Sequence, residues 1–281
     1  MGLKERVVLP LAKRWIAGPD LKSAIADAKK ANARGIGVVA NFLGEDIKDS
    51  AAADSQAGEY LKLQQAIADE NIKGFASVKL TQFGLGADEA GVRSRLERVA
   101  GNAERLGQLL WIDMEGSSFT DITIRTYLEA HERHEGLGVA LQAYAKRSRS
   151  DLEAILLAGG RVRLVKGAYK ESHDFAYGTR REVRENYTRL MEVLFQKGRG
   201  FAIGTHDTSL VEKARQLAES SNADFHFEML KGIRDELKDD LVKSGYKVYE
   251  YLPYGDSWYA YSKRRMSEHP SNFWLLLRSL I

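Results

Sequence analysis

Positive side chains interrupt two apolar runs of this sequence, and two more stand together near its end. Lys79 lies in Ser77-Val78-Lys79-Leu80, Arg163 and Lys166 lie in Val162-Arg163-Leu164-Val165-Lys166-Gly167-Ala168-Tyr169, and the pair is Arg264-Arg265. A charge within a buried run needs a partner or a ligand, and arginine holds a carboxylate through two parallel hydrogen bonds. These residues predict an anion site, although Lys79 could extend its head to water and the arginine pair could be a solvated helix turn.

Acidic and amide side chains interrupt further apolar runs. Asp113 and Glu115 are two residues apart in Trp111-Ile112-Asp113-Met114-Glu115, which places both on one face of a strand. We expect one of them in the site, unless a neighbouring arginine pairs with it. Gln142 can donate to and accept from a ligand, or it can satisfy buried backbone groups. A buried lysine can also form a Schiff base, so an aldolase that uses Lys79 or Lys166 is a second hypothesis.

Histidines and carboxylates near two other apolar runs raise the question of a metal. His206, Asp207, His226 and Glu228 are residue types that ligate metal at the strand ends of barrel hydrolases. No run contains an H-x-H pair, and the remaining histidines, at 131, 134, 173 and 269, fall in predicted helices or loops. We therefore expect no metal site.

Short apolar runs alternate along the chain with long amphipathic stretches, a pattern typical of strands followed by helices. The expected strands are Ile36–Leu43, Phe75–Leu80, Leu109–Glu115, Val139–Tyr144, Arg161–Gly167, Phe201–His206, Phe225–Leu230 and Lys247–Leu252. Such alternation implies a parallel sheet, and eight units in one domain's length predict a closed (β/α)8 barrel. The rival is an open doubly wound sheet, which usually shows a G-x-G-x-x-G loop after an early strand; this chain has none there.

The barrel fold places the chemistry, because active sites of such barrels lie at the C-terminal ends of the strands. Before the first strand, residues 1–34 include an expected helix from Asp20 to Arg34, which we expect to plug or flank the barrel's N-terminal face. A last helix is expected from Trp258 to about Glu268, carrying both arginines. With no linker composition, residues 1–281 are expected to form a single domain.

Composition excludes several functions. The net charge of +3 and the lack of a lysine-arginine block argue against nucleic-acid binding. The absence of cysteine excludes disulfides, thiol catalysis and thiolate metal sites. The N-terminus lacks a signal-peptide pattern, and no run reaches the roughly 18 apolar residues that span a bilayer. A cytoplasmic protein is expected.

Together, these runs resemble the proline dehydrogenase family. The resemblance is carried by Ser77-Val78-Lys79-Leu80, Ile112-Asp113-Met114-Glu115, Gln142-Ala143-Tyr144, Val162 through Tyr169, Thr205-His206, Phe227-Glu228-Met229-Leu230, and Tyr251 through Glu268. They occur in the family's order, and the runs Arg163–Tyr169 and Arg264-Arg265 are the most specific. A barrel that binds but no longer catalyses is the third hypothesis, which the intact set of carboxylate-binding residues disfavours.

The resemblance implies FAD held noncovalently at the barrel mouth and oxidation of L-proline to Δ1-pyrroline-5-carboxylate by hydride transfer from proline C5 to flavin N5. Electrons would pass to a quinone through peripheral contact with the inner face of the membrane. The chain resembles the short, monofunctional type, which would be linked functionally to a separate pyrroline-5-carboxylate dehydrogenase.

The resemblance also implies residue roles. Lys79, Arg264 and Arg265 would bind the proline carboxylate, Glu268 would hold Arg265, and Tyr251 and Leu230 would wall the pyrrolidine ring. Asp113 and Arg163 match catalytic positions, with Arg163 beside the flavin. The cofactor-binding positions are matched by Met114, Gln142, Arg163, Lys166, Gly167, Ala168, Thr205, His206 and Glu228.

Two residues depart from the family pattern. Many relatives carry glutamine where Glu228 stands and asparagine where Asp207 stands. Both departures add negative charge near the cofactor, which would lower its potential or change its affinity unless each carboxylate is paired.

Overall fold

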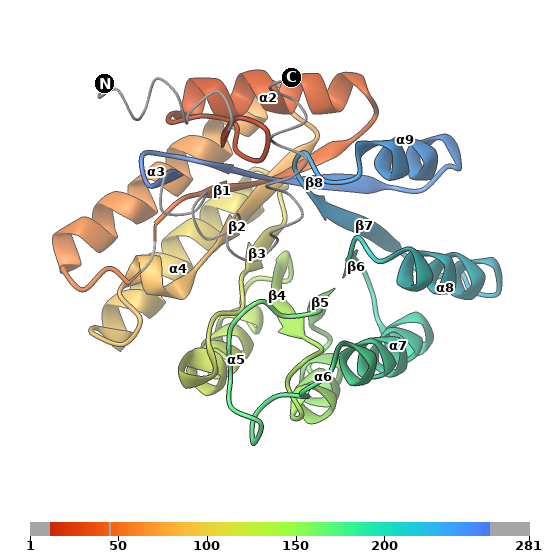
Figure 1. Ribbon diagram of the computed structural model, residues 1–281. Helices are drawn as coiled ribbons and strands as arrows, with labels where there is room; N and C mark the ends of the chain where they lie inside the picture. The colour runs from red at the N-terminus through yellow and green to blue at the C-terminus, as the bar shows by residue number, and fades with distance from the viewer. Residues whose placement is uncertain (1–11, 45, 259–281) are drawn as a thin grey trace.

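The strands of the protein form a closed barrel, which confirms the predicted fold. The computed structural model describes residues 12–44 and 46–258. Neighbouring strands pair in parallel in the order β1-β2-β3-β4-β5-β6-β7-β8, and β8 closes on β1. Figure 1 shows the strands at the centre with helices around them. The strands are β1 Gly37–Phe42, β2 Gly74–Val78, β3 Leu110–Ile112, β4 Leu137–Gln142, β5 Arg161–Val165, β6 Phe201–Gly204, β7 Phe225–Leu230 and β8 Val248–Tyr254.

The helices follow the amphipathic stretches of the sequence. They are α2 Leu21–Ala33, α3 Ser50–Asp69, the 3-10 helix η1 Leu80–Phe83, α4 Glu89–Arg105, α5 Ser117–His131, α6 Ser148–Leu157, α7 Arg180–Lys197, α8 Thr208–Glu219 and α9 Asp235–Lys243. Side-chain oxygens accept from first-turn N–H groups of five helices; the residues that supply them are Asp20, Asp49, Asp88, Thr179 and Asp207. These bonds satisfy donors that a helix leaves without partners.

Helix α2 has the predicted bounds but not the predicted place. Asp20 accepts from the Ser23 N–H at 2.8 Å, and Gly35 follows the helix in a left-handed conformation, with φ at 79°. The helix packs against β1 and β8, and its buried alanines join the core between strands and helices. It therefore lies along the side of the barrel (Figure 1), and the expectation that it plugs or flanks the N-terminal face is wrong.

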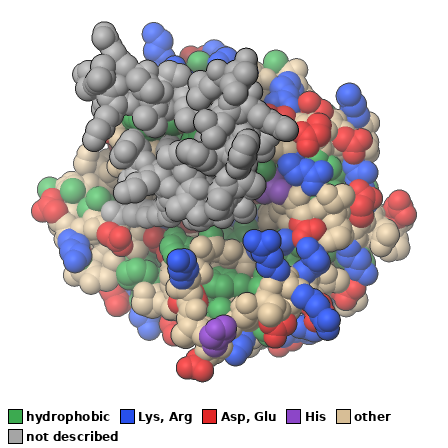
Figure 2. Space-filling model, viewed as in Figure 1, with side chains coloured by type: hydrophobic (Ala, Val, Ile, Leu, Met, Phe, Trp, Pro, Cys, Tyr) green, Lys and Arg blue, Asp and Glu red, His purple; other side chains and the backbone are tan. Residues whose placement is uncertain are grey.

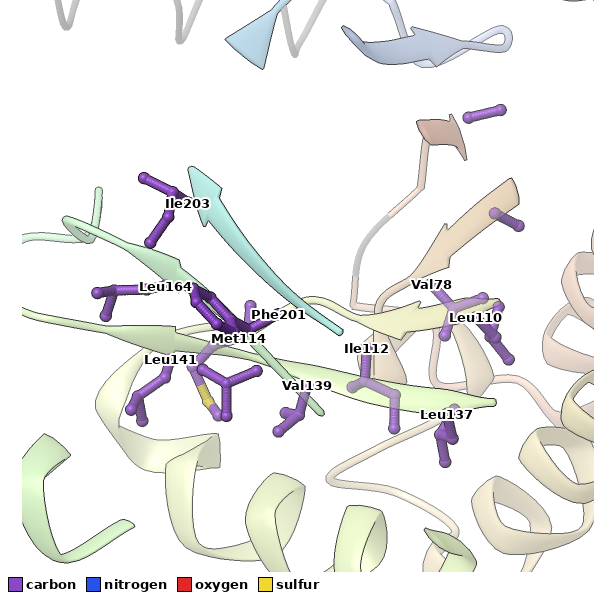
Figure 3. Packing of buried hydrophobic residues seen from close by; sticks show 14 of the residues in the cluster. Val78, Leu110, Ile112, Met114, Leu137, Val139, Leu141, Leu164, Phe201 and Ile203 are labelled. Atoms are coloured by element: carbon purple, nitrogen blue, oxygen red, sulfur yellow. The ribbon is translucent and has the colours of Figure 1, made fainter. Parts of the chain in front are cut away.

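Alternate residues of each strand face two different environments, as period-two geometry requires. Figure 3 shows Ile112, Val139 and Leu141 directed toward the surrounding helices, within the large buried cluster. A smaller cluster inside the barrel includes Val39, Phe75, Trp111 and Ala202. Arg163 on β5, Glu228 on β7 and Tyr251 on β8 share this inward parity, so their placement follows from the alternation.

Several strands end earlier than predicted. Pairing of β2 with β3 ends at Val78 opposite Ile112, and pairing of β5 with β6 ends at Val165 opposite Gly204. Lys79 is therefore the residue before η1, not part of a strand, and Asp113 follows β3. The strand ends diverge into loops, which is why polar groups collect at the mouth of the barrel.

On the face that Figure 2 shows, Lys and Arg side chains are interspersed with Asp and Glu.

Within the described part of the chain, no helix is both long enough and apolar enough to cross a membrane.

Candidate active site

Asp113 lies at the centre of a buried polar cluster inside the barrel mouth. Its Oδ1 accepts from Ser77 Oγ at 2.7 Å and from Arg163 Nη2. Its Oδ2 accepts from Lys79 Nζ at 3.0 Å and from the Tyr251 hydroxyl at 2.7 Å. Side chains from β2, β5 and β8, together with Lys79 after β2, thus converge on one carboxylate that follows β3 and is 7% exposed.

The charges in this cluster are fixed by their mutual contacts. Burial alone would raise the pKa of Asp113, but the charges of Lys79 and Arg163 outweigh it and hold that pKa well below its usual range. Burial and the neighbouring carboxylate raise the pKa of Tyr251 well above its ordinary value, so its hydroxyl keeps the proton that it donates to Asp113.

Lys79 is held as a cation. Burial works against the charged amine, yet the acidic neighbours Tyr251 and Asp113 more than offset it, and the pKa of Lys79 is raised well above its ordinary value. Because Tyr251 is protonated at neutral pH, Asp113 is the partner that carries the negative charge. A charged lysine is a poor nucleophile, so this geometry disfavours the aldolase hypothesis.

Arg163 spans the barrel interior between two carboxylates. Its Nη2 donates to Asp113, and its Nη1 donates to Glu228 Oε2 at 3.2 Å. The guanidinium also lies over the rings of Trp111 and Tyr251, with its central carbon 5.6 and 5.7 Å from the ring centres. Burial opposes its charge, but the two carboxylates raise the pKa of Arg163 above its ordinary value.

Glu115 does not join this cluster. Its carboxylate accepts from the Thr81 N–H at 3.2 Å and from the Thr81 hydroxyl at 2.6 Å, so it holds the turn after β2. Of the two carboxylates that follow β3, Asp113 is the one with hydrogen bonds to Ser77, Lys79, Arg163 and Tyr251.

A second polar group lies where β5 and β6 end. Asp207 accepts from Lys166 Nζ at 2.6 Å and from Arg184 Nε at 3.0 Å, and it caps α8 through the Ser209 N–H. Burial raises the pKa of Asp207, but these donors prevail and hold the pKa well below its usual range. Two cations and a helix N-terminus therefore meet at this edge of the barrel.

The remaining predicted residues line the same end of the barrel. Gln142 Nε2 donates to the Met114 carbonyl at 3.3 Å, and the Thr205 hydroxyl accepts from the Asp207 N–H at 3.2 Å. His206 Nε2 accepts from the Leu230 N–H at 2.8 Å, which places the proton of a neutral imidazole on Nδ1. These hydrogen bonds orient the side chains of Gln142, Thr205 and His206.

Gly167 is required by its surroundings. Its φ is 103°, and a Cβ there would lie 1.9 Å from a ring carbon of Tyr144. The residue opens the loop between β5 and α7, and Ala168, which follows it, is exposed.

Both departures from the family pattern are paired. Glu228 contacts Arg163 and also His226, whose Nε2 lies 2.9 Å from Glu228 Oε1. Asp207 has Lys166 and Arg184. The added negative charges are thus compensated by side chains of this chain.

Sequence reasoning missed three residues. Ser77 donates to Asp113, and period-two spacing from Lys79 would have placed both on one face. His226 was considered only as a metal ligand, yet it pairs with Glu228. Nothing in the sequence marks Arg184, which reaches Asp207 from α7. Arg264, Arg265 and Glu268 lie outside the described residues.

Known proteins are similar to this chain over most of its length. A family model described as proline dehydrogenase matches residues 24–273. Proline dehydrogenase 2 of Bacillus subtilis (strain 168) is 33% identical over 264 residues, which cover 93% of this chain and 87% of that protein. The proline dehydrogenase of Deinococcus radiodurans is 34% identical over 279 residues, covering 96% and 90%.

A solved structure shares the fold. Proline utilization A from Bdellovibrio bacteriovorus, inactivated by N-propargylglycine, superposes with a TM-score of 0.87 at 24% identity. The match covers 93% of this chain and 33% of that longer chain. Since the family model matches most of the chain and relatives above 30% identity align along nearly all of it, the chain belongs to the proline dehydrogenase family.

Proposed function

We propose that this protein oxidises L-proline to Δ1-pyrroline-5-carboxylate with noncovalently bound FAD and passes the electrons to a quinone, as the first step of proline breakdown to glutamate. The observation that carries the proposal is the buried cluster of Lys79, Asp113, Arg163 and Tyr251 inside the mouth of a barrel in this family. We propose further that residues 1–281 act as one domain.

The substrate's carboxylate would be held by fixed cations. Lys79 is charged and oriented by Asp113, and we assign Arg264 and Arg265 to the same carboxylate, with Glu268 holding Arg265. Tyr251 would pack against the pyrrolidine ring with its hydroxyl bound to Asp113, and Leu230, half-buried at the end of β7, would close the other side. Such clamping sets the ring in one orientation, which is the main task of a protein in hydride transfer.

The residues at the mouth fit a dinucleotide. Lys166, Arg184 and the N-terminus of α8 supply positive charge suited to a diphosphate, and Thr205 supplies a hydroxyl beside them. Gln142, Met114, Gly167, Ala168 and His206 would complete the cofactor site. When bound, FAD supplies the acceptor, N5, for the hydride that leaves proline C5.

The reaction removes a hydride from C5 and a proton from the ring nitrogen, which leaves the C=N bond of the product. Arg163, held between Asp113 and Glu228, would place a cation beside the flavin and favour its electron-rich reduced state. Asp113 would act by fixing Lys79, Arg163 and Tyr251 at once.

We place the protein in the cytoplasm, with peripheral contact at the inner face of the membrane for transfer to quinone. Its product would pass to a separate pyrroline-5-carboxylate dehydrogenase.

The proposal is tested by incubating purified, FAD-loaded protein with L-proline and a quinone analogue, and trapping the product with o-aminobenzaldehyde. Formation of the coloured adduct that depends on both proline and FAD supports the proposal. No adduct from a correctly folded, FAD-loaded protein would contradict it.

A further inference from the structure

A histidine and a glutamate form a buried pair behind the arginine of the site. His226 and Glu228 are two residues apart on β7, so both point into the barrel. His226 is 7% exposed and Glu228 is 4% exposed. Glu228 matches a cofactor-binding position, whereas His226 has no role in the function proposed above, and the pair lies on the far side of Arg163 from Asp113.

The two oxygens of Glu228 have different partners. Oε1 is 2.9 Å from His226 Nε2, and Oε2 accepts from Arg163 Nη1 at 3.2 Å. An imidazole N–H that occupies one oxygen fixes the plane of the carboxylate and therefore the direction in which the other oxygen meets the guanidinium. Burial disfavours the ionised form, but Arg163 and His226 outweigh it and lower the pKa of Glu228.

His226 itself is held by aromatic rings. Its ring centre lies 4.8 Å from that of Tyr249, 6.1 Å from that of Phe75 and 6.3 Å from that of Trp111. These contacts come from β8, β2 and β3, so the imidazole is confined from three sides. A confined donor can fix the position of a carboxylate, whereas a mobile one cannot.

The negative charge of Glu228 affects the position of Arg163 in the site. Arg163 faces two buried carboxylates, and a Glu228 with no second partner would draw the guanidinium away from Asp113 and leave its own negative charge less compensated. By binding Oε1, His226 limits both effects. The order of contacts is therefore His226, Glu228, Arg163, Asp113, from the interior to the site.

We propose that His226 is a positioning residue, which acts through Glu228 to hold Arg163 against Asp113 and to set the electrostatic environment of the flavin. The proposal rests on the function proposed above. It predicts that His226 matters only while Glu228 is charged, and that it affects the flavin without contacting it.

A double-mutant cycle on FAD-loaded protein tests the coupling. His226→Phe keeps an aromatic ring among Phe75, Trp111 and Tyr249 but removes the donor, and Glu228→Gln removes the charge at equal size. We expect His226→Phe to lower kcat about tenfold or more, the loss of a hydrogen bond to a charged group, with the proline KM changed less than kcat. In the Glu228→Gln background the same change should cost less than about threefold, because the negative charge through which His226 acts on Arg163 is absent.

The midpoint potential of bound FAD is the second readout, since a purely structural role would not move it in a defined direction. We expect His226→Phe to lower the potential and Glu228→Gln to raise it. His226→Gln, which can still donate to Oε1, should restore the potential toward the wild-type value. Should His226→Phe fail to fold, the remaining variants still test the proposal, because Glu228→Gln should raise the potential and His226→Gln should leave it near the wild-type value.

Equal losses of kcat from His226→Phe in both backgrounds would overturn the proposal, as would a potential that Glu228→Gln leaves unchanged. These outcomes differ from failure of the proposed function. In that case the wild-type protein would already give no proline-dependent reduction, whereas here wild type is active and only the coupling is lost.

Discussion

Lys79 and Asp113, which follow neighbouring strands of the barrel, form a buried ion pair with Nζ 3.0 Å from Oδ2. Their side chains are 13% and 9% exposed, so solvent screens the pair little. Asp113 also accepts from Tyr251 and Arg163, so one carboxylate orients three groups of the site. The pair identifies Lys79 as a permanent cation and not a nucleophile.

Substitution of Lys79 separates these two roles. If its charge is what matters, Lys79→Arg should keep part of the activity, while Lys79→Met should lower kcat/KM for proline at least about tenfold, in the range of a charged hydrogen bond. Steady-state kinetics of both variants at matched FAD content measure the difference.

An aldolase gives the opposite pattern. Both substitutions would then abolish turnover, and borohydride with a carbonyl substrate would trap the wild-type protein covalently. The same trapping should be tried for Lys166, whose Nζ is bound to Asp207. Covalent trapping on either lysine would contradict the assignment, and peptide mass spectrometry would show which.

The Arg264-Arg265 pair should contribute to substrate binding. Arg264→Met or Arg265→Met leaves the proline carboxylate with one fewer charge-assisted partner, so each should cost about 1.5–3 kcal/mol in kcat/KM. We expect the loss mostly in KM, with flavin content unchanged. A near-normal proline KM in both variants would show that this segment does not face the substrate.

FAD should be bound without a covalent bond. The sequence has no cysteine for a thioether link, and the residues at the mouth offer cations and hydrogen-bond donors. Acid precipitation should therefore release all of the flavin colour into the supernatant. Colour that remains with the pellet would indicate a covalent attachment and would refute this expectation.

Asp207 should make stability depend on pH. Its pKa is lowered in the folded protein, so its contribution is present above the unfolded carboxylate value, about 4, and is lost as pH falls through the folded value. Asp207→Asn keeps an oxygen to cap α8 but removes both ion pairs, each worth roughly 0.2–1 kcal/mol at partly exposed positions.

Urea unfolding of wild type and Asp207→Asn between neutral pH and pH about 3 measures the effect. The variant should be less stable at neutral pH, and the gap should begin to narrow only below about pH 4, the unfolded carboxylate value. Asp49→Asn is a matched control, because Asp49 caps α3 in the same way but forms no ion pair with any residue that the structure describes. If the difference in unfolding free energy between wild type and Asp207→Asn does not change with pH, the charge of Asp207 does not stabilise the folded protein.

The barrel could be predicted because its signals are local. A short apolar run marks each strand, and the alternation of these runs with helices leaves a parallel closed sheet as the favoured arrangement. All eight strands overlap their predicted ranges. Their ends could not be predicted, because where β2 or β3 stops depends on pairing across the sheet and not on the residues that follow.

The site could be predicted residue by residue but not contact by contact. A lone charge in an apolar run identified Lys79, Asp113 and Arg163 as candidates, since burial of such a charge requires a partner. Which partner each one takes depends on barrel closure, which brings Tyr251 to Asp113 across 138 positions of the sequence. The roles of Ser77 and Arg184 emerge only from that geometry.

The most direct test of the account is anaerobic mixing of the purified, FAD-loaded protein with L-proline while the visible flavin absorbance is followed. The account predicts that L-proline bleaches the flavin, that Asp113→Ala slows the bleaching by at least about a hundredfold because two buried cations lose their carboxylate, and that D-proline has little effect. A wild-type spectrum that L-proline leaves unchanged would contradict the central claim.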